Sequence, residues 1–330
     1  MSSTRDRIIE YIKQNHQARP HDLVNYFGLS NMAIHKQLRK LVLEGILEKA
    51  GKPPLVFYIL SSKLPVEIGK LKFPQELEEI INANFLSITP VGNLLYGMEG
   101  FIYWAKIYQK NKQIDLLVKE YAKAFKNIDK HKTKEGLIDA SSKLSDFPVK
   151  YVDKLFYQTI YSLPLFGRTK LAKIVMYAKQ IEDKNLIDKI ATLGKPYIEK
   201  IIKTYNINAV CFIPPTLPRK LQFMDELESR LNLSLPKVDL VKAGSGDILI
   251  PQKTLSSLNE RVINAQSSIY IKNIKEPSFA NILLIDDVAG SGASFNETAK
   301  KLKALKIGFR KIIAFAFVGN IKGYDVIRQI

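Results

Sequence analysis

The stretch NILLIDDVAGSGASFNETAKKLKALKIG, residues 281–308, places two adjacent carboxylates between an apolar run and a loop of glycine and serine. The run at 282–285 is wholly apolar, which is typical of a strand in a parallel sheet covered on both faces. Residues 296–306 contain good helix formers and predict a helix. The stretch therefore predicts a strand, a loop and a helix, the repeating unit of α/β proteins.

The loop after this strand is the first candidate binding site. In strand–loop–helix units, the N–H groups of the turn and of the helix N-terminus converge on one point. Gly290 and Gly292 allow a ligand close to the backbone, and Ser291 and Ser294 add hydroxyl donors. Residues 289–294 are therefore predicted to surround a phosphate.

The two aspartates must face a different part of the ligand, because Asp286 and Asp287 would repel a phosphate. Paired carboxylates accept hydrogen bonds from neighbouring sugar hydroxyls, and they help to hold a divalent cation directly or through water. The implied ligand is a sugar phosphate, with Mg²⁺ near the pair. An ordinary strand-to-helix turn with an N-terminal cap is the alternative.

The order of apolar run, acidic pair and Gly/Ser loop resembles the phosphoribosyl-pyrophosphate (PRPP) motif of type I phosphoribosyltransferases. The resemblance implies that the acidic pair binds the ribose hydroxyls and the loop binds the 5-phosphate, with Mg²⁺ bound alongside PRPP. Gly290 stands where members that act on purines often have an aspartate as general base, and a glycine cannot move a proton. By position, the PRPP-binding set is Asp286, Asp287, Ala289, Gly290, Ser291, Gly292, Ala293 and Ser294.

The resemblance extends upstream over roughly residues 151–330. VCFIPPTLPRKLQF (210–223) is similar to the pyrophosphate loop of that fold, and LPLFGRTKLAKIVMYAKQ (163–180) is similar to the start of the domain. NERVINA (259–265) resembles the E-R-x-x-N element in the long mobile loop of ComF-like proteins. A solvated turn and an exposed helix cation are the alternatives. The resemblance implies a pyrophosphate-binding set of Pro215, Thr216, Arg219, Lys220 and Arg261.

Residues 5–60 have a different pattern, with two short helical segments before a third that starts near Ser30. Ser30 suits an N-cap, and Leu29 and Ile34 suit a hydrophobic staple. Residues 34, 38, 41 and 42 recur at helical spacing and predict the buried stripe. Two short strands, 46–49 and 55–60, follow around a turn that lifts Lys52 outward.

Helix, helix, recognition helix and β-wing is an order that resembles the winged helix-turn-helix domain of bacterial and archaeal regulators. The resemblance implies double-stranded DNA as partner, with a helix in the major groove and flanking cations on phosphates. A domain that mediates only protein contacts is the alternative. The candidate DNA-binding residues are Asn31, Met32, His35, Lys36, Arg39, Lys40, Lys49 and Lys52.

Composition supports a chain with polyanionic partners. The 330 residues carry a net charge of +18, which favours phosphate-bearing ligands or nucleic acid. No run approaches the ~18 apolar residues of a membrane span, and the start lacks the form of a signal peptide, so a cytoplasmic protein without membrane contact is expected. The one cysteine, Cys211, is predicted to be a buried hydrophobe, and the four histidines indicate no zinc site.

Three domains are expected: a winged helix at 1–61, a mainly helical connector or dimerisation region at 62–150, and a phosphoribosyltransferase-like domain with a parallel sheet at 151–330. Helical fragments are expected at 77–81, 116–125 and 137–144. Aromatic residues at 101–108 indicate core packing or a dimer seam, with an effector pocket as the alternative.

The sequence therefore predicts a homodimeric DNA-binding transcriptional regulator that senses PRPP or a related nucleotide. An active Mg²⁺-dependent phosphoribosyltransferase, or a ComF-like protein that handles single-stranded DNA, remains an alternative.

Overall fold

The protein was analysed as a computed structural model, which describes residues 3–61, 71–90, 92–244, 246–274, 281–305 and 309–320. The chain divides into two compact units, each treated by itself. Residues from the range expected to form a connector contribute to both units. The first unit comprises Met1–Lys72, Ile88–Leu95 and Ile102–Lys110, and the second comprises Phe73–Ser87, Tyr96–Phe101 and Asn111–Ile330.

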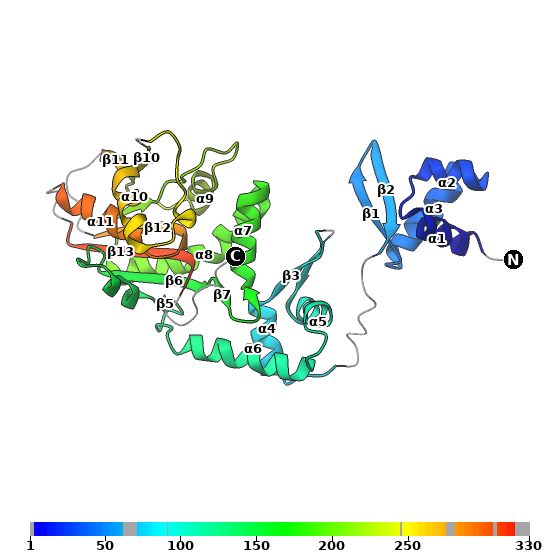
Figure 1. Ribbon diagram of the computed structural model, residues 1–330, viewed down its shortest axis with the longest axis horizontal. Helices are drawn as coiled ribbons and strands as arrows, with labels where there is room; N and C mark the ends of the chain where they lie inside the picture. The colour runs from blue at the N-terminus through cyan, green and yellow to red at the C-terminus, as the bar shows by residue number, and fades with distance from the viewer. Residues whose placement is uncertain are drawn as a thin grey trace. The chain divides into compact units, whose positions relative to one another are not determined.

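The N-terminal domain contains three helices followed by a two-stranded antiparallel hairpin (Figure 1). Gly51 pairs with Val56 in the hairpin at φ +83°, and a Cβ there would lie 2.2 Å from the Leu55 carbonyl oxygen. Glycine is therefore required where the chain turns. The elements are α1 (Thr4–Asn15), α2 (Pro20–Phe27), α3 (Asn31–Leu43), β1 (Leu47–Lys52) and β2 (Leu55–Leu60).

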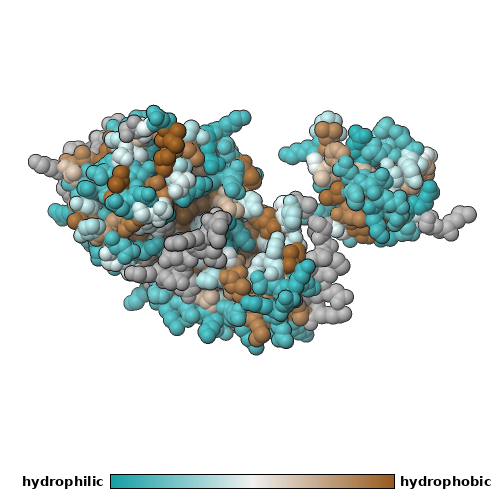
Figure 2. Space-filling view, in the orientation of Figure 1, coloured by the Kyte–Doolittle hydropathy of each residue, from teal (hydrophilic) through white to brown (hydrophobic). Residues whose placement is uncertain are grey.

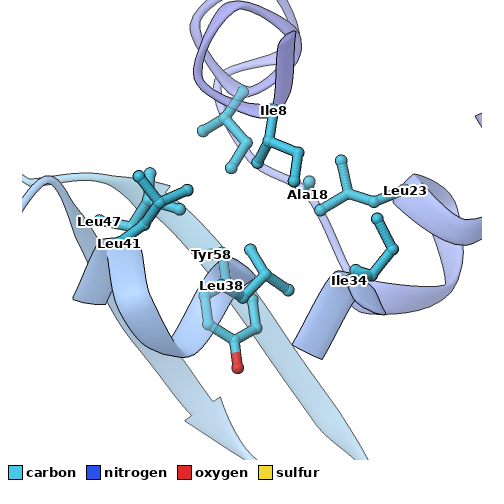
Figure 3. Close-up of a cluster of buried hydrophobic side chains, with 9 residues drawn as sticks. Ile8, Ala18, Leu23, Ile34, Leu38, Leu41, Leu47 and Tyr58 are labelled. Atoms are coloured by element: carbon cyan, nitrogen blue, oxygen red, sulfur yellow. The ribbon is translucent and has the colours of Figure 1, made fainter. Parts of the chain in front are cut away.

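One apolar cluster holds this domain together (Figure 3). The predicted cap is confirmed, because the Ser30 hydroxyl accepts a hydrogen bond from the Ala33 N–H at 3.2 Å, and α3 begins at the next residue. Tyr58 of β2 and Ala18 exchange backbone hydrogen bonds, which fixes the hairpin against the α1–α2 segment. The buried members are Ile8, Ile12, Ala18, Leu23, Ile34, Leu38, Leu41, Leu47 and Tyr58.

The second unit is built on a five-stranded sheet in the order β5-β6-β13-β12-β9. The expectation of a parallel sheet needs correction, because the edge strand β5 runs antiparallel to β6 and the other four strands are parallel. This edge strand comes from the range expected to be helical connector. The strands are β5 (Ile138–Asp139), β6 (Lys154–Ile160), β9 (Ala209–Phe212), β12 (Asn281–Ala289) and β13 (Lys311–Gly319).

Helices and a separate β-ribbon surround this sheet (Figure 1). Gly194 of α8 sits against the ring of Phe317 in β13, where an added Cβ would lie 2.1 Å from a ring carbon. This close approach sets α8 directly on the sheet. The elements are α7 (Lys170–Ile181), α8 (Lys184–Tyr205), α9 (Phe223–Leu231), α10 (Leu258–Ser268), α11 (Ala293–Ala304), and the antiparallel ribbon β10 (Val238–Lys242) with β11 (Ile269–Ile274).

The remaining elements precede the sheet or connect its strands. The expected helix at 137–144 is wrong, because strand β5 and a 3₁₀ helix occupy that range, whereas the fragments expected at 77–81 and 116–125 lie within helices. Within the described ranges, every helix is too short or too polar to cross a lipid bilayer. The elements are α4 (Gln75–Asn84), β3 (Leu86–Ile88), β4 (Leu94–Tyr96), α5 (Gly97–Tyr108), α6 (Ile114–Asp129), η2 (Ser141–Asp146), β7 (Ser162–Leu163), β8 (Gly167–Arg168) and η3 (Gln252–Thr254).

Aromatic side chains from the former connector range pack into the second unit. Phe85, Phe101, Tyr121 and Phe166 form edge or tilted ring contacts with centroids 5.0–6.1 Å apart. Tyr121 is 1% exposed and its hydroxyl has no hydrogen-bond partner among the described residues. These rings form core packing in the second unit, and Phe101 is the one member that comes from the aromatic segment 101–108.

Candidate functional site

The candidate site lies at the C-terminal end of β12, which runs between β13 and β9 in the sheet. Residues 282–285 of β12 are fully buried, so the apolar run is the centre of the sheet. Asp286 and Asp287 follow directly, and Asp287 is only 5% exposed. Because the four parallel strands end at the same edge, the segments that follow β9 and β12 are brought together there.

The two adjacent aspartates have opposite electrostatic environments. Asp287 forms an ion pair with the Lys179 ammonium of α7. Burial alone would raise the pKa of Asp287, but Lys179 and the neighbouring hydrogen bonds lower it below its ordinary value. Burial, followed by the negative charge of Asp287, raises the pKa of Asp286 well above its ordinary value. Asp287 is therefore the ionised member of the pair, and Asp286 is the member that resists ionisation.

Two lysines beside the acidic pair were not expected from the sequence. Burial would lower the pKa of Lys179, but Asp287 outweighs it and raises that pKa. Lys242, at the end of β10, has a pKa lowered by burial, while Asp286 acts in the opposite direction. Its ammonium donates a hydrogen bond to the Thr216 hydroxyl at 2.8 Å. The site therefore presents two ammonium groups to two carboxyl groups.

The loop after the acidic pair has a shape that depends on glycine. Gly292 is the N-cap of α11 at φ +86°, in the left-handed region that side chains rarely adopt. The Ser291 hydroxyl accepts a hydrogen bond from the Ala293 N–H at 3.3 Å. Helix α11 begins at Ala293, three residues before the expected start, so Ala293 and Ser294 belong to its first turn. The N-terminus of α11 and the loop thus adjoin the acidic pair, as a phosphate site requires.

Two cations reach the same loop from other parts of the second unit. The Lys143 ammonium, from η2, donates a hydrogen bond to the Gly290 carbonyl at 2.6 Å. A Cβ on Gly290 would lie 3.6 Å from Nη1 of Arg261, so this guanidinium is a neighbour of the loop. Arg261 lies in helix α10 and donates from Nη2 to the Leu255 carbonyl at 2.9 Å, so the expectation that its segment is a loop is corrected.

The expected pyrophosphate residues lie in the turn after β9, with Arg261 on α10. Thr216 contacts Lys242, and the Arg219 guanidinium donates to the Lys179 carbonyl oxygen. Arg219 therefore supports the end of α7 that carries Lys179. Pro215 is half-buried and Lys220 is exposed in the same turn.

The candidate DNA-binding side chains share one property, which is exposure to solvent. Met32, in the first turn of α3, is 82% exposed. The face of this domain drawn in Figure 2 is mainly hydrophilic over its three helices. The exposed residues are Asn31, Met32, His35, Lys36, Arg39 and Lys40 on α3, with Lys49 and Lys52 on β1.

Comparison with known proteins gives little beyond this geometry. No protein-family model and no curated protein matches the chain. Among solved structures, it is similar to a hypoxanthine phosphoribosyltransferase from Staphylococcus aureus, at 15% sequence identity and a TM-score of 0.25, over 44% of this chain and 82% of that chain. A TM-score this low carries no argument, so any assignment depends on the topology and residues described above.

Proposed function

We propose that this chain is a DNA-binding transcriptional regulator whose C-terminal domain binds PRPP, or a related nucleotide, together with Mg²⁺. One observation carries the proposal: an acidic pair lies near the carboxyl end of the buried strand β12, which ends at Ala289, and a glycine-dependent loop and the N-terminus of α11 come next. Carboxyl groups suit ribose hydroxyls, and backbone N–H groups at a helix start suit a phosphate. The two kinds of group are adjacent, as they must be for a phosphorylated sugar.

The residues present fit a loosely held magnesium ion. Within the described ranges, no cluster of three or more His, Cys, Asp or Glu side chains could hold a metal. Asp286 and Asp287 would therefore contact Mg²⁺ only together with water and the phosphates of the ligand, which is how this ion usually binds in proteins. The ion would neutralise part of the pyrophosphate charge.

The cations around the pair have separate roles in this proposal. Lys242, with Thr216, lies where a pyrophosphate attached to the ribose would meet positive charge, and Arg219 steadies the end of α7. The Lys179 ammonium is ion-paired with the Asp287 carboxylate in the ligand-free protein. A ribose hydroxyl must therefore bind this carboxylate beside the ammonium or in its place. Lys143 and Arg261 adjoin the phosphate loop at Gly290.

The N-terminal domain supplies the DNA-binding half of the proposal. A buried apolar stripe fixes α3 in its domain, while the opposite face keeps cations and polar side chains in solvent, as a helix in the major groove requires. PRPP would regulate DNA affinity only if it binds two conformations unequally. A homodimer on a pseudo-symmetric operator is part of the proposal.

The test is fluorescence anisotropy of the full chain with duplex DNA from the region upstream of its own gene, with and without Mg²⁺ and PRPP. We expect PRPP to change the affinity for this duplex and not for a scrambled duplex. The variant Asp286→Asn/Asp287→Asn should bind the duplex normally and ignore PRPP. If the chain does not bind the duplex, or if neither PRPP nor related nucleotides change its affinity for the duplex, the proposal of a transcriptional regulator is refuted.

A second candidate function is transfer of the phosphoribosyl group from PRPP by an active enzyme. The cations beside the acidic pair favour it, because positive charge stabilises a departing pyrophosphate. Gly290 provides no general base at the loop. Release of pyrophosphate from PRPP in the presence of a panel of purine and pyrimidine bases separates the two functions, since a sensor releases none.

A further inference from the structure

Four cations gather at the N-terminal end of α7, away from the acidic pair. We call them the α7 cation cluster: Arg168 of β8, Lys170 and Lys173 of α7, and Lys189 of α8. Lys170 and Lys179 are separated by nine residues of one helix, or about 14 Å along its axis. The cluster is therefore a different place from the candidate site, although the same helix reaches both.

Neutral oxygens hold the lysines of this cluster in position. The Lys170 ammonium donates to the Asn82 carbonyl at 3.2 Å, and the Lys173 ammonium donates to the Leu86 carbonyl at 2.5 Å. These carbonyls belong to α4 and β3, and Figure 1 shows α4 near the end of α7 that follows β7. Segments far apart in the sequence thus fix the cluster.

Tyr96 brings two of the cations to one ring. The Lys189 ammonium donates to the Tyr96 hydroxyl at 3.0 Å and lies 4.6 Å from the ring centroid, while the Lys170 ammonium lies 5.6 Å from the same centroid. The two ammonium groups therefore share one aromatic ring, which offers each a weak attraction without neutralising it.

The environment of the cluster is unfavourable for so much positive charge. Burial lowers the pKa of Lys173 to about 8, and the charge of Arg168 acts in the same direction. Burial and then Lys189 lower the pKa of Lys170. The first turn of α7 carries no acidic residue, and its helix dipole adds positive potential. No ion pair to any of the four is found within the described ranges.

The hydrogen bonds of the cluster leave donors available. Each lysine ammonium has three N–H groups, and each makes one hydrogen bond among the described residues. Arg168 uses its Nε toward the Tyr161 hydroxyl at 2.8 Å, which leaves its terminal nitrogens. Half-buried N–H donors gathered at one end of a helix, with no ion-paired carboxylate among the described residues, match the oxygens of an anion that carries several negative charges.

We propose that the α7 cation cluster is a second phosphate-binding site, which takes a multiply charged phosphate: the oligophosphate of a nucleotide or the phosphodiester backbone of DNA. The site does not depend on the PRPP assignment, because none of its residues belongs to the acidic pair or to the loop after it. Bound phosphate would remove the repulsion among the four cations and satisfy their remaining donors.

The experiment uses the full chain and two probes, sodium tripolyphosphate in calorimetry and a labelled DNA duplex in anisotropy. The test variant is Lys170→Gln/Lys173→Gln/Lys189→Gln. The control is Lys112→Gln/Lys119→Gln/Lys123→Gln, which removes the same charge from exposed positions in and before α6. Replacement of the three cluster lysines by arginine should retain binding, and circular dichroism melting verifies that each variant folds.

We expect the test variant to lose at least tenfold in affinity for one probe or both, with less than a twofold change in the control. A loss for tripolyphosphate alone identifies a small phosphate ligand. A loss for DNA, with a salt slope reduced by up to roughly 3, identifies the DNA backbone. Equal affinities of test and control variants for both probes would overturn the proposal, whatever PRPP does at Asp286 and Asp287.

Discussion

Replacement of each of the two adjacent aspartates by asparagine should change the stability of the ligand-free protein in opposite directions. Asp287 is ion-paired with Lys179, whereas Asp286 forms no ion pair among the described residues, and burial and the charge of Asp287 disfavour its ionised form. We therefore expect Asp287→Asn to destabilise the ligand-free protein, and Asp286→Asn to leave it unchanged or more stable. Both variants should lose PRPP binding, because each removes a carboxylate that the ligand needs.

The magnitude follows from the exposure of the two partners. Breaking a fully buried ion pair costs about 3–5 kcal/mol, since one charge stays buried without compensation. The Lys179 side chain is 37% exposed and Asp287 only 7%, so Lys179 regains part of its hydration when its partner is lost. A discounted loss of about 1–3 kcal/mol is expected for Asp287→Asn, which lowers the Tm of the second unit by roughly 2–8 °C.

The pH dependence of folding stability gives a second test of this prediction. The raised pKa of Asp286 means that the folded state holds its proton more tightly than the unfolded state does. Stability of the wild type therefore falls as pH rises from the unfolded pKa through the folded pKa. Asp286→Asn has no such proton, so its advantage over the wild type should grow as the pH rises across that window.

Melting curves by circular dichroism at several pH values, with the double variant included, measure both effects. Calorimetric titration with Mg²⁺ and PRPP supplies the binding readout. The electrostatic reasoning fails if the two single variants shift the Tm equally, or if Asp286→Asn loses stability relative to the wild type as the pH is raised. Retained PRPP affinity in either variant would separately refute the role of the pair in binding.

Three other substitutions probe single features. Gly292→Ala should cost about 1 kcal/mol in stability, because φ is +86°, and should weaken PRPP binding in calorimetry. Ser30→Ala should lower the stability of the N-terminal domain by about 1 kcal/mol in a thermal melt, since it removes the cap of α3. Gly290→Asp should fold normally and keep its Tm in a thermal melt, because the nearest atom to its Cβ is Arg261 Nη1 at 3.6 Å, an ordinary van der Waals distance.

The local pattern of the sequence was sufficient for elements whose physics is local. The run at 282–285, the loop glycines and the cap at Ser30 each depend on neighbours a few residues away, and the structure has a strand, a turn and a helix start at those positions. The sequence predicts the start of α11 three residues too late, because small residues such as Ala293 carry no amphipathic signal.

The sequence could not reveal features that depend on distant contacts. Lys179 meets Asp287 from 108 residues away, and Lys242 reaches Thr216 only because the β10–β11 ribbon folds back beside the sheet. Lysine is usually solvated, so nothing in the α7 sequence distinguishes Lys179 from its neighbours. Strand β5 has only two residues, too few for a periodic pattern, which is why its range was expected to be helical.

The charges beside the acidic pair indicate which ligands the proposed site would favour. Lys179 is ion-paired with Asp287 and Asp286 resists ionisation, so the unliganded site offers an anion little beyond the charge of Lys242. The 5-phosphate of a nucleotide has its own donors in the Gly290–Ser294 segment and needs little more. A pyrophosphate on the ribose brings several negative charges next to the carboxylates, more than Lys242 alone offsets, so an added cation must supply the remainder. Affinity for PRPP should consequently depend steeply on Mg²⁺, whereas affinity for a nucleoside monophosphate should depend on it weakly, and this difference follows from the charge balance alone.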